Sequence, residues 1–113
     1  MSTSKRGQSS DKDLYGGLIR LHVLHHAAKE PLHGLWVIKE LRRHGYELSP
    51  GTLYPMLHGL ERKGFLISRR ERTEGRLRRV YEITPEGRVA FRDAKEKLRE
   101  LFGELFEEDQ TGV

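Results

Sequence analysis

Glycines and prolines divide this chain into a few segments, and the pattern inside each segment limits what the chain can fold into. Pro31, Gly45 and Gly64 separate stretches of regular apolar spacing, and Pro85 opens the last stretch. A glycine just past a helix and a proline in its first turn are common helix boundaries. The chain has 113 residues, which suits a single domain. The expected order is helix, helix, helix, β-hairpin and long helix.

Apolar residues recur at helical spacing in the three segments before Gly64. This spacing predicts helices over residues 13–28, 32–44 and 50–63. Ser49 as N-cap and Pro50 as first helical residue form a common start for the third helix. Pro55 lies inside that helix, where it removes one backbone hydrogen bond and is expected to kink or tighten the helix start. The buried stripe of the third helix is expected to consist of Leu53, Met56, Leu57 and Leu60.

The pattern changes from helical spacing to alternation after Gly64. Residues 65–71 are too few and too rich in β-forming side chains for a helix, and residues 77–83 alternate along the chain. Gly75 lies between them at a position that suits a positive φ. We therefore predict a β-hairpin with a short basic loop, followed by a helix that Thr84 caps and Pro85 opens.

The last helix is expected over residues 85–107, and its apolar residues step by three and four, like the seam of a coiled coil. A three-helix core is too small to bury a seam of this length. We therefore predict that the helix pairs with a second copy of the chain; a helix packed only on its own domain is the alternative. The residues expected at the dimer interface are Leu14, Leu18, Leu21, Phe91, Ala94, Leu98, Leu101 and Leu105.

Charge is distributed unevenly along the chain, whose net charge is +4. Eight of residues 62–79 are lysine or arginine and two are glutamate, whereas residues 93–109 hold seven acids and three bases. A polyanion would therefore meet one end of the molecule. This distribution favours nucleic acid as a partner.

Composition excludes several classes of protein. No cysteine is present, which excludes disulfides and thiol chemistry and favours the reducing cytoplasm. No apolar run is long enough to cross a membrane, and the polar start of the chain is not a signal peptide. No nucleophile elbow or glycine-rich phosphate loop occurs, so neither an enzyme nor a bound cofactor is expected.

The two ends of the chain are expected to be disordered. Residues 1–12 would form an N-terminal arm and residues 109–113 a C-terminal tail.

Three helices followed by a strand pair with a charged tip is the order of a winged helix-turn-helix protein. The expected fold class is therefore α+β, mainly α, with a winged helix-turn-helix domain over residues 13–84 and a C-terminal dimerisation helix over residues 85–108. The third helix would enter the major groove of double-stranded DNA, and the hairpin would reach the phosphates. The expected DNA-binding residues are Ser49, Thr52, Tyr54, Pro55, His58, Arg62, Arg72, Arg76 and Arg78.

Three stretches carry a resemblance to a known family. Residues 49–66 read SPGTLYPMLHGLERKGFL and resemble the recognition helix of the PadR family of bacterial transcriptional regulators, which is close to G-T-L-Y-P-x-L-x-x-L-E. Residues 33–41 resemble the family's H-G-Y-x-L-x-x-x-L segment, with Leu35 and Trp36 as variations. Residues 78–88 resemble its R-x-Y-x-L-T-x-x-G turn into the last helix. The single short C-terminal helix resembles the compact subgroup of the family.

The resemblance implies a homodimer that binds DNA and most often represses a nearby gene. It covers the chain from residue 14 to residue 106. The residues that match the family's recognition helix by position are Ser49, Thr52, Tyr54, Pro55 and His58. The wing varies between members of the family, so the resemblance says less about the three wing arginines.

The aromatic residues outside the helix stripes leave two interpretations open. Trp36, Phe102 and Phe106 are candidates for an effector pocket at the centre of the dimer, or they fill the core. A flat aromatic or cationic small molecule would suit such a pocket. Its binding would change the spacing of the recognition helices and release the DNA.

A winged helix can also serve as a protein-docking module, which would need an apolar or mixed surface on the third helix.

Histidines cluster in the first helix. His22 and His26 are one helical turn apart, a spacing that can hold one metal ion and would make a metal-sensing regulator. No carboxylate or cysteine accompanies them locally, so no metal ligand is assigned. In the alternative interpretations, His22, His25 and His26 pack at the dimer seam, face solvent or make the seam sensitive to pH.

Overall fold

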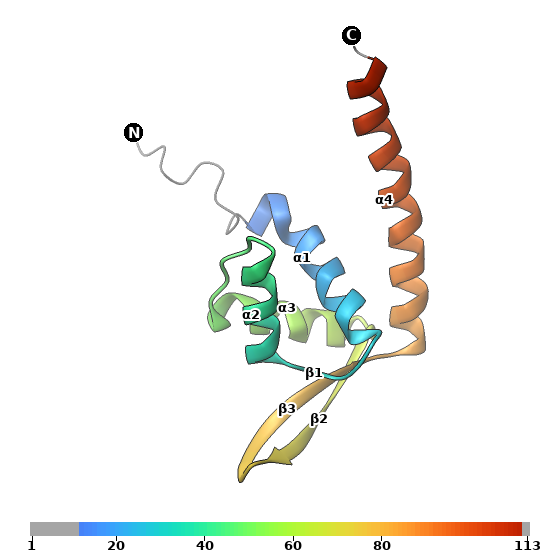
Figure 1. The fold of residues 1–113 in the computed structure, drawn as a ribbon. Coiled ribbons are helices and arrows are strands. Elements are labelled where there is room, and N and C mark those ends of the chain that lie inside the picture. Colours follow the sequence, from blue (N-terminus) through green and yellow to red (C-terminus); the bar gives the residue numbers. More distant parts are fainter. Residues whose placement is uncertain (1–11, 112–113) are drawn as a thin grey trace.

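The computed structural model describes residues 12–111 (Figure 1). These residues form four helices and three strands. In chain order the elements are α1 (Lys12–Ala27), β1 (Leu32–His33), α2 (Gly34–Arg43), α3 (Pro50–Arg62), β2 (Leu66–Thr73), β3 (Arg76–Ile83) and α4 (Pro85–Thr111). The arm expected at residues 1–12 lies outside the described residues, except that Lys12 begins α1.

A short strand precedes α2. The apolar spacing predicts a helix from residue 32, but the helix begins at Gly34, and Leu32 and His33 form β1 instead. β1 pairs with β3 in antiparallel fashion, so that Leu32 lies opposite Tyr81 and His33 opposite Val80. Leu32 and Tyr81 are both buried there. The strand forms because pairing with β3 satisfies backbone groups next to the core, and local spacing carries no information about that distant partner.

β2 and β3 form the predicted hairpin, in a sheet with the strand order β1-β3-β2. The strands are longer than the alternation indicates, because their pairing continues to Thr73 opposite Arg76. Glu74 and Gly75 make the turn, with φ angles of 53° and 78°. Two consecutive positive φ angles are typical of a type I′ turn, whose twist matches that of the strands. The hairpin therefore projects as a twisted two-stranded ribbon (Figure 1).

The core lies where α1, α2 and α3 pack on one another and on the base of the sheet. The predicted stripe of α3, Leu53, Met56, Leu57 and Leu60, is buried. The largest fully buried side chains are Tyr81, Ile19, Leu41, Leu53, Leu57, Leu66, Val23 and Val80. Full burial of one such side chain contributes about 1.5–3 kcal/mol. These contacts hold α3 with its opposite side toward solvent.

α4 packs against α1 near its own start and then extends away from the rest of the chain (Figure 1). Its predicted cap is confirmed, since the Gly87 N–H donates a hydrogen bond of 2.9 Å to Oγ1 of Thr84. The helix continues to Thr111, past the expected end at residue 107, so the tail expected from residue 109 begins inside the helix. Residues 112–113 lie outside the described part of the chain. None of the helices between residues 12 and 111 is both long and apolar enough to cross a membrane.

Candidate nucleic-acid interface

α3 exposes a polar side opposite its buried stripe. Ser49, Pro55, His58 and Arg62 are exposed, and Thr52 is half-buried. The helix is one continuous element, so its internal proline does not break it. The hydroxyl, imidazole and guanidinium groups on this side can bond to phosphates or base edges.

The first turn of α3 has no side-chain cap from its N-cap residue, Ser49. Ser49 precedes the helix with an extended backbone, but its side chain does not cap the helix. Its hydroxyl lies 3.4 Å from Oγ1 of Thr52 instead. Backbone amides and the positive end of the helix dipole at such a start attract phosphates. The start of α3 therefore suits an approach to the DNA backbone.

Tyr54 is placed differently from the other polar residues of α3. Its ring is half-buried and packs against the core. The ring lies against Gly34 at the start of α2, where an added Cβ would overlap it. Tyr54 also lines a small hollow together with Arg76, Arg78 and Arg79 of β3. Tyr54 is therefore only partly exposed, because its side chain lies between α2 and the hairpin.

The hairpin turns one positively charged face toward α3. Side chains alternate along a strand, and Ser68 marks the inner face because its hydroxyl donates a 2.8 Å hydrogen bond to Oε2 of Glu61 in α3. Arg70 and Arg72 follow Ser68 at steps of two on β2, and Arg79 lies opposite Arg70 on β3. All three arginines are exposed. We call these three residues, Arg70, Arg72 and Arg79, the arginine face.

The outer face of the hairpin is more balanced in charge. Arg69 forms ion pairs with Glu82 and Glu71. Arg78 lies opposite Glu71 and is half-buried, and Arg76 is exposed at the tip. The outer face therefore offers less unbalanced positive charge than the arginine face.

The wing residues expected to contact DNA are Arg72, Arg76 and Arg78, and they do not include Arg70 and Arg79. The structure places Arg72 on the inner face and the other two on the outer face. Alternation outward from the buried Leu66 and Tyr81 places the two omitted arginines on the same face as Ser68. The sequence alone does not indicate that the strands extend as far as the turn.

A hydrogen-bonded chain fixes the hairpin relative to α3. Nη1 of Arg79 donates to Oγ of Ser68 at 2.8 Å. Ser68 in turn donates to Oε2 of Glu61 from its hydroxyl at 2.8 Å and from its backbone N–H at 3.2 Å. Glu61 belongs to the last turn of α3. The arginine face therefore keeps a defined orientation beside α3.

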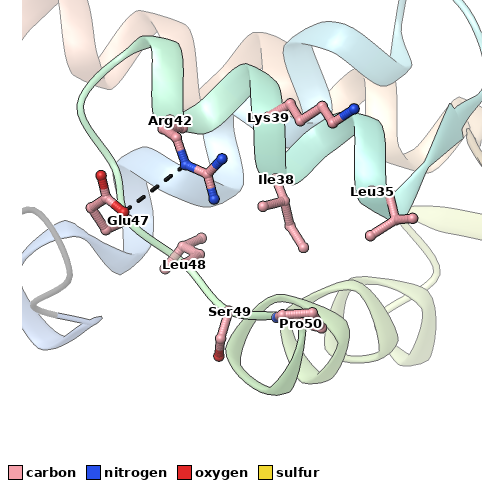
Figure 2. A pocket seen from close by; sticks show the side chains of 8 residues that line it. All are labelled: Leu35, Ile38, Lys39, Arg42, Glu47, Leu48, Ser49 and Pro50. Atoms are coloured by element: carbon pink, nitrogen blue, oxygen red, sulfur yellow. Dashed lines mark ion pairs between the residues drawn. The ribbon is translucent and has the colours of Figure 1, made fainter.

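A hollow of about 550 Å³ separates α2 from the start of α3 (Figure 2). Figure 2 shows Ile38 and Leu35 pointing into it from α2 and Pro50 facing them from α3. Arg42 and Glu47 form an ion pair of 4.0 Å at its edge. The full lining is Leu35, Ile38, Lys39, Arg42, Glu47, Leu48, Ser49 and Pro50. Apolar residues form its floor, and its basic side chains add positive charge near the start of α3.

The three aromatic residues expected to line an effector pocket lie on different elements. Trp36 is exposed on α2, with its ring centre 5.2 Å from that of His26. Phe102 and Phe106 contact each other on α4, with ring centres 4.5 Å apart. α1 lies between α2 and the far part of α4 in Figure 1. One chain therefore does not bring these residues together.

Most residues expected at the dimer interface are exposed in the single chain. The exposed ones are Leu14, Leu18, Leu98, Leu101 and Leu105, and the half-buried ones are Leu21, Phe91 and Ala94. Phe91 packs against the core of its own chain. The remaining leucines leave α1 and α4 with apolar surface in contact with water.

The part of the chain that carries the helix-turn-helix and the wing matches a known family. Residues 23–93 match the transcriptional regulator PadR-like family. The chain belongs to this family. The PadR-like assignment confirms the resemblance of the recognition helix and the wing. Since the family consists of transcriptional regulators, the chain is a transcriptional regulator and not an enzyme.

Individual relatives support the PadR-like fold over most of the chain. The transcriptional regulator Rv3488 of Mycobacterium tuberculosis is 53% identical over 87 residues, which are 77% of this chain and 81% of the relative. A crystal structure of a PadR family regulator from Eggerthella lenta has a TM-score of 0.76 and 28% identity, and covers 88% of each chain. A transcriptional regulator from Thermoplasma acidophilum has a TM-score of 0.75 and 28% identity, and covers 88% of this chain and 97% of that one. The winged-helix fold with a C-terminal helix is thereby confirmed.

Proposed function

We propose that this PadR-like regulator is a cytoplasmic homodimeric repressor that binds an imperfect palindrome in double-stranded DNA and leaves it when an effector binds. The arginine face is the observation that carries the proposal, because its three exposed arginines share the face of the hairpin that Ser68 joins to the last turn of α3. A surface of this kind is the electrostatic footprint of a DNA-binding protein.

In the proposed complex, α3 enters the major groove with its exposed side. An α-helix fits this groove, and the polar groups of α3 suit bonds to base edges. The start of the helix would meet a phosphate, which its dipole favours. The α3 residues proposed to contact DNA are Ser49, Thr52, Tyr54, Pro55, His58 and Arg62.

The wing would bind the phosphate backbone beside that groove. Arg72 would act with the rest of the arginine face, and Arg76 and Arg78 would reach a neighbouring phosphate from the outer face. Contacts of this kind release counterions, so binding weakens as the salt concentration rises. They contribute affinity and orientation rather than sequence preference.

Two copies would join through α1 and α4. Leu14 is 67% exposed and Leu105 is 51% exposed in the single chain. Their burial in an interface would stabilise the dimer, because each Å² of buried apolar area contributes about 25 cal/mol. The proposed interface comprises Leu14, Leu18, Leu21, Phe91, Ala94, Leu98, Leu101 and Leu105. A two-fold dimer would place two α3 helices in half-sites about one DNA turn apart. Because the two helices are related by two-fold symmetry, the two half-sites are expected to form a palindrome.

A small-molecule effector would bind where Trp36 of one protomer approaches Phe102 and Phe106 of the partner subunit. Support for a pocket that only the dimer completes comes from the exposure of all three aromatic residues and their separation within one chain. A bound flat aromatic or cationic molecule would shift α4 and with it the spacing of the α3 helices. An effector that binds tightly but leaves operator affinity unchanged would contradict this part of the proposal.

The experiment that tests DNA recognition is fluorescence anisotropy with a labelled duplex from the region upstream of the protein's own gene. A scrambled duplex of the same length is the control, and both are measured at two salt concentrations. We expect tight, salt-sensitive binding to the native duplex and weaker binding to the scrambled one. Equal and weak binding to both would contradict an operator in that region and favour the docking-module interpretation.

A further inference from the structure

Three imidazoles from two helices meet where α1 packs against the end of α2. His22 and His26 lie one turn apart on α1, and His44 is the C-cap of α2. One ring nitrogen from each of the three lies within 4.8 Å of the other two. The ring centres of His22 and His44 are 4.8 Å apart. Helical spacing indicated the first two residues, and packing adds the third.

A carboxylate lies beside two of these three imidazoles. Oε2 of Glu40 lies 3.1 Å from Nε2 of His44 and 3.5 Å from Nε2 of His26. Arg43 donates a hydrogen bond of 2.8 Å to the other carboxylate oxygen, Oε1, so that Oε2 is left toward the imidazoles. The Glu40 side chain is only 12% exposed. Three nitrogens and one oxygen are a common ligand set for a tetrahedral zinc ion.

One of the three imidazoles has a buried ring nitrogen without a hydrogen-bond partner in the part of the chain that the structure describes. Nε2 of His26 is buried and has no hydrogen-bond partner among the described residues, since its distance to Glu40 is too long for a good bond. A buried ring nitrogen without a hydrogen-bond partner is available to a metal ion.

We propose that His22, His26 and His44, together with Glu40, bind one divalent transition-metal ion of the zinc class per chain. Imidazole nitrogens suit zinc, cobalt, nickel and copper more than magnesium or calcium. Ligand atoms on a tetrahedral zinc ion lie about 3.3 Å apart, so the ion would draw the rings slightly closer than they are here. His44 is exposed and can rotate to close that distance.

An ion at this place would join α1 to the segment that leads into α3. The chain leaves α2 at His44 and starts α3 after Ser49. A metal ion bound to His44 would fix the position of this connection, and with it the orientation of α3 toward DNA. The metal site itself does not depend on the proposed operator binding, and the two proposals can be tested separately.

The first test is a titration of the full, tag-free, metal-stripped chain with Co²⁺, followed by visible absorption. Tetrahedral coordination gives intense bands in the visible range, and Zn²⁺ should displace Co²⁺ at one equivalent per chain. His26→Gln and His44→Gln are each expected to lower the affinity for Zn²⁺ by about 100-fold or more, because each loses a direct ligand.

His25→Gln is the matched control. The His25 ring centre lies 4.9 Å from that of His26, but His25 is exposed and is not one of the three histidines whose ring nitrogens approach one another. This variant is expected to keep the zinc affinity of the unmodified protein. An unchanged affinity in His44→Gln, or a loss in His25→Gln equal to that in His44→Gln, would overturn the proposed ligand set.

Thermal unfolding gives a second measurement that also checks whether the variants fold. Zn²⁺ at about 100 times its Kd is expected to raise the Tm of the unmodified protein and of His25→Gln by about 10 °C. His44→Gln should unfold cooperatively at a Tm similar to that of the metal-free protein, with no increase on addition of Zn²⁺. An equal increase in His44→Gln would place the ion elsewhere and overturn the proposal.

Discussion

Gly34 and Tyr54 show how a pair of single residues shapes the surface beside α3. They belong to separate stretches of the chain, and the Tyr54 ring occupies the space that a Cβ of Gly34 would need. The ring in turn lines a hollow with the arginines of the wing. The absence of one side chain on α2 therefore lets a residue of the recognition helix reach the hairpin.

Gly34→Ala is expected to lower the free energy of unfolding by about 1–3 kcal/mol, because the added methyl group would displace the Tyr54 ring. Chemical denaturation measures this change. Gly17→Ala is the control, since a Cβ there meets no atom within 4 Å. The control should be neutral or stabilise the protein by up to about 1 kcal/mol. Similar losses in both variants would show that contact with Tyr54 is not the cause.

Tyr81 offers a second prediction at the scale of one residue. Its side chain is fully buried, and its hydroxyl has no hydrogen-bond partner among the described residues. Desolvation raises the pKa of this hydroxyl, so it stays protonated. Tyr81→Phe is expected to be neutral or to raise the free energy of unfolding by up to about 1 kcal/mol, because it removes an unpaired polar group from the core.

The control for Tyr81→Phe is Tyr81→Ala, which leaves a cavity and should cost about 3–5 kcal/mol. Both changes are measured by chemical denaturation. If Tyr81→Phe costs more than about 1 kcal/mol, the hydroxyl makes a bond in solution that the described side chains do not supply.

At the scale of elements, the two faces of the hairpin carry different sets of arginines. The arginine face adjoins α3, whereas Arg69 on the outer face is paired with two glutamates. Arg72→Ala is expected to weaken binding to native and scrambled duplexes alike and to reduce the salt slope by about 1 for one lost phosphate contact. Anisotropy at several salt concentrations measures this slope.

Arg69→Ala is the matched control for Arg72→Ala, because it removes an arginine from the same strand but from the opposite face. It is expected to change the salt slope much less. An equal effect of the two substitutions would argue that total charge, and not the arginine face, determines DNA affinity.

α4 provides the prediction about assembly. Leu101 is 44% exposed on the seam of α4, and a glutamate there would place a charge inside the proposed interface. Leu101→Glu is expected to convert the dimer to a monomer in light scattering coupled to size exclusion. Arg99→Glu introduces the same residue two positions away, on the other side of the helix, and should leave the dimer intact. A dimer that survives Leu101→Glu would place the interface elsewhere.

At the scale of the whole molecule, the core is small and α4 extends away from it (Figure 1). The proposed dimer would supply the burial that the single chain lacks. We therefore expect the Tm to rise with protein concentration, as it does when folding and association are coupled. Calorimetry over a hundredfold range of concentration tests this, and the monomeric Leu101→Glu variant should show no such dependence. A constant Tm in the unmodified protein would mean that the chain is stable alone.

Much of the fold could be predicted from the sequence because it depends on near neighbours in the chain. The order of the helices and the hairpin, the buried stripe of α3 and the cap at Thr84 all follow from residues a few positions apart. The type of each element depends mainly on backbone preferences and apolar periodicity over such short distances. The recognition-helix motif was informative for the same reason, as it is one continuous stretch.

Tertiary structure alone decided the features that join distant segments. β1 forms because Leu32 meets Tyr81, the Tyr54 ring rests on Gly34, and His44 joins His22 at the end of α2. The two members of each pair are far apart in the chain, and no local pattern records which helix or strand will pack on which. The sequence by itself therefore determined the four helices, the hairpin and the family, but not β1. Packing decided which side chains share a site, because only the folded chain brings them within bonding distance.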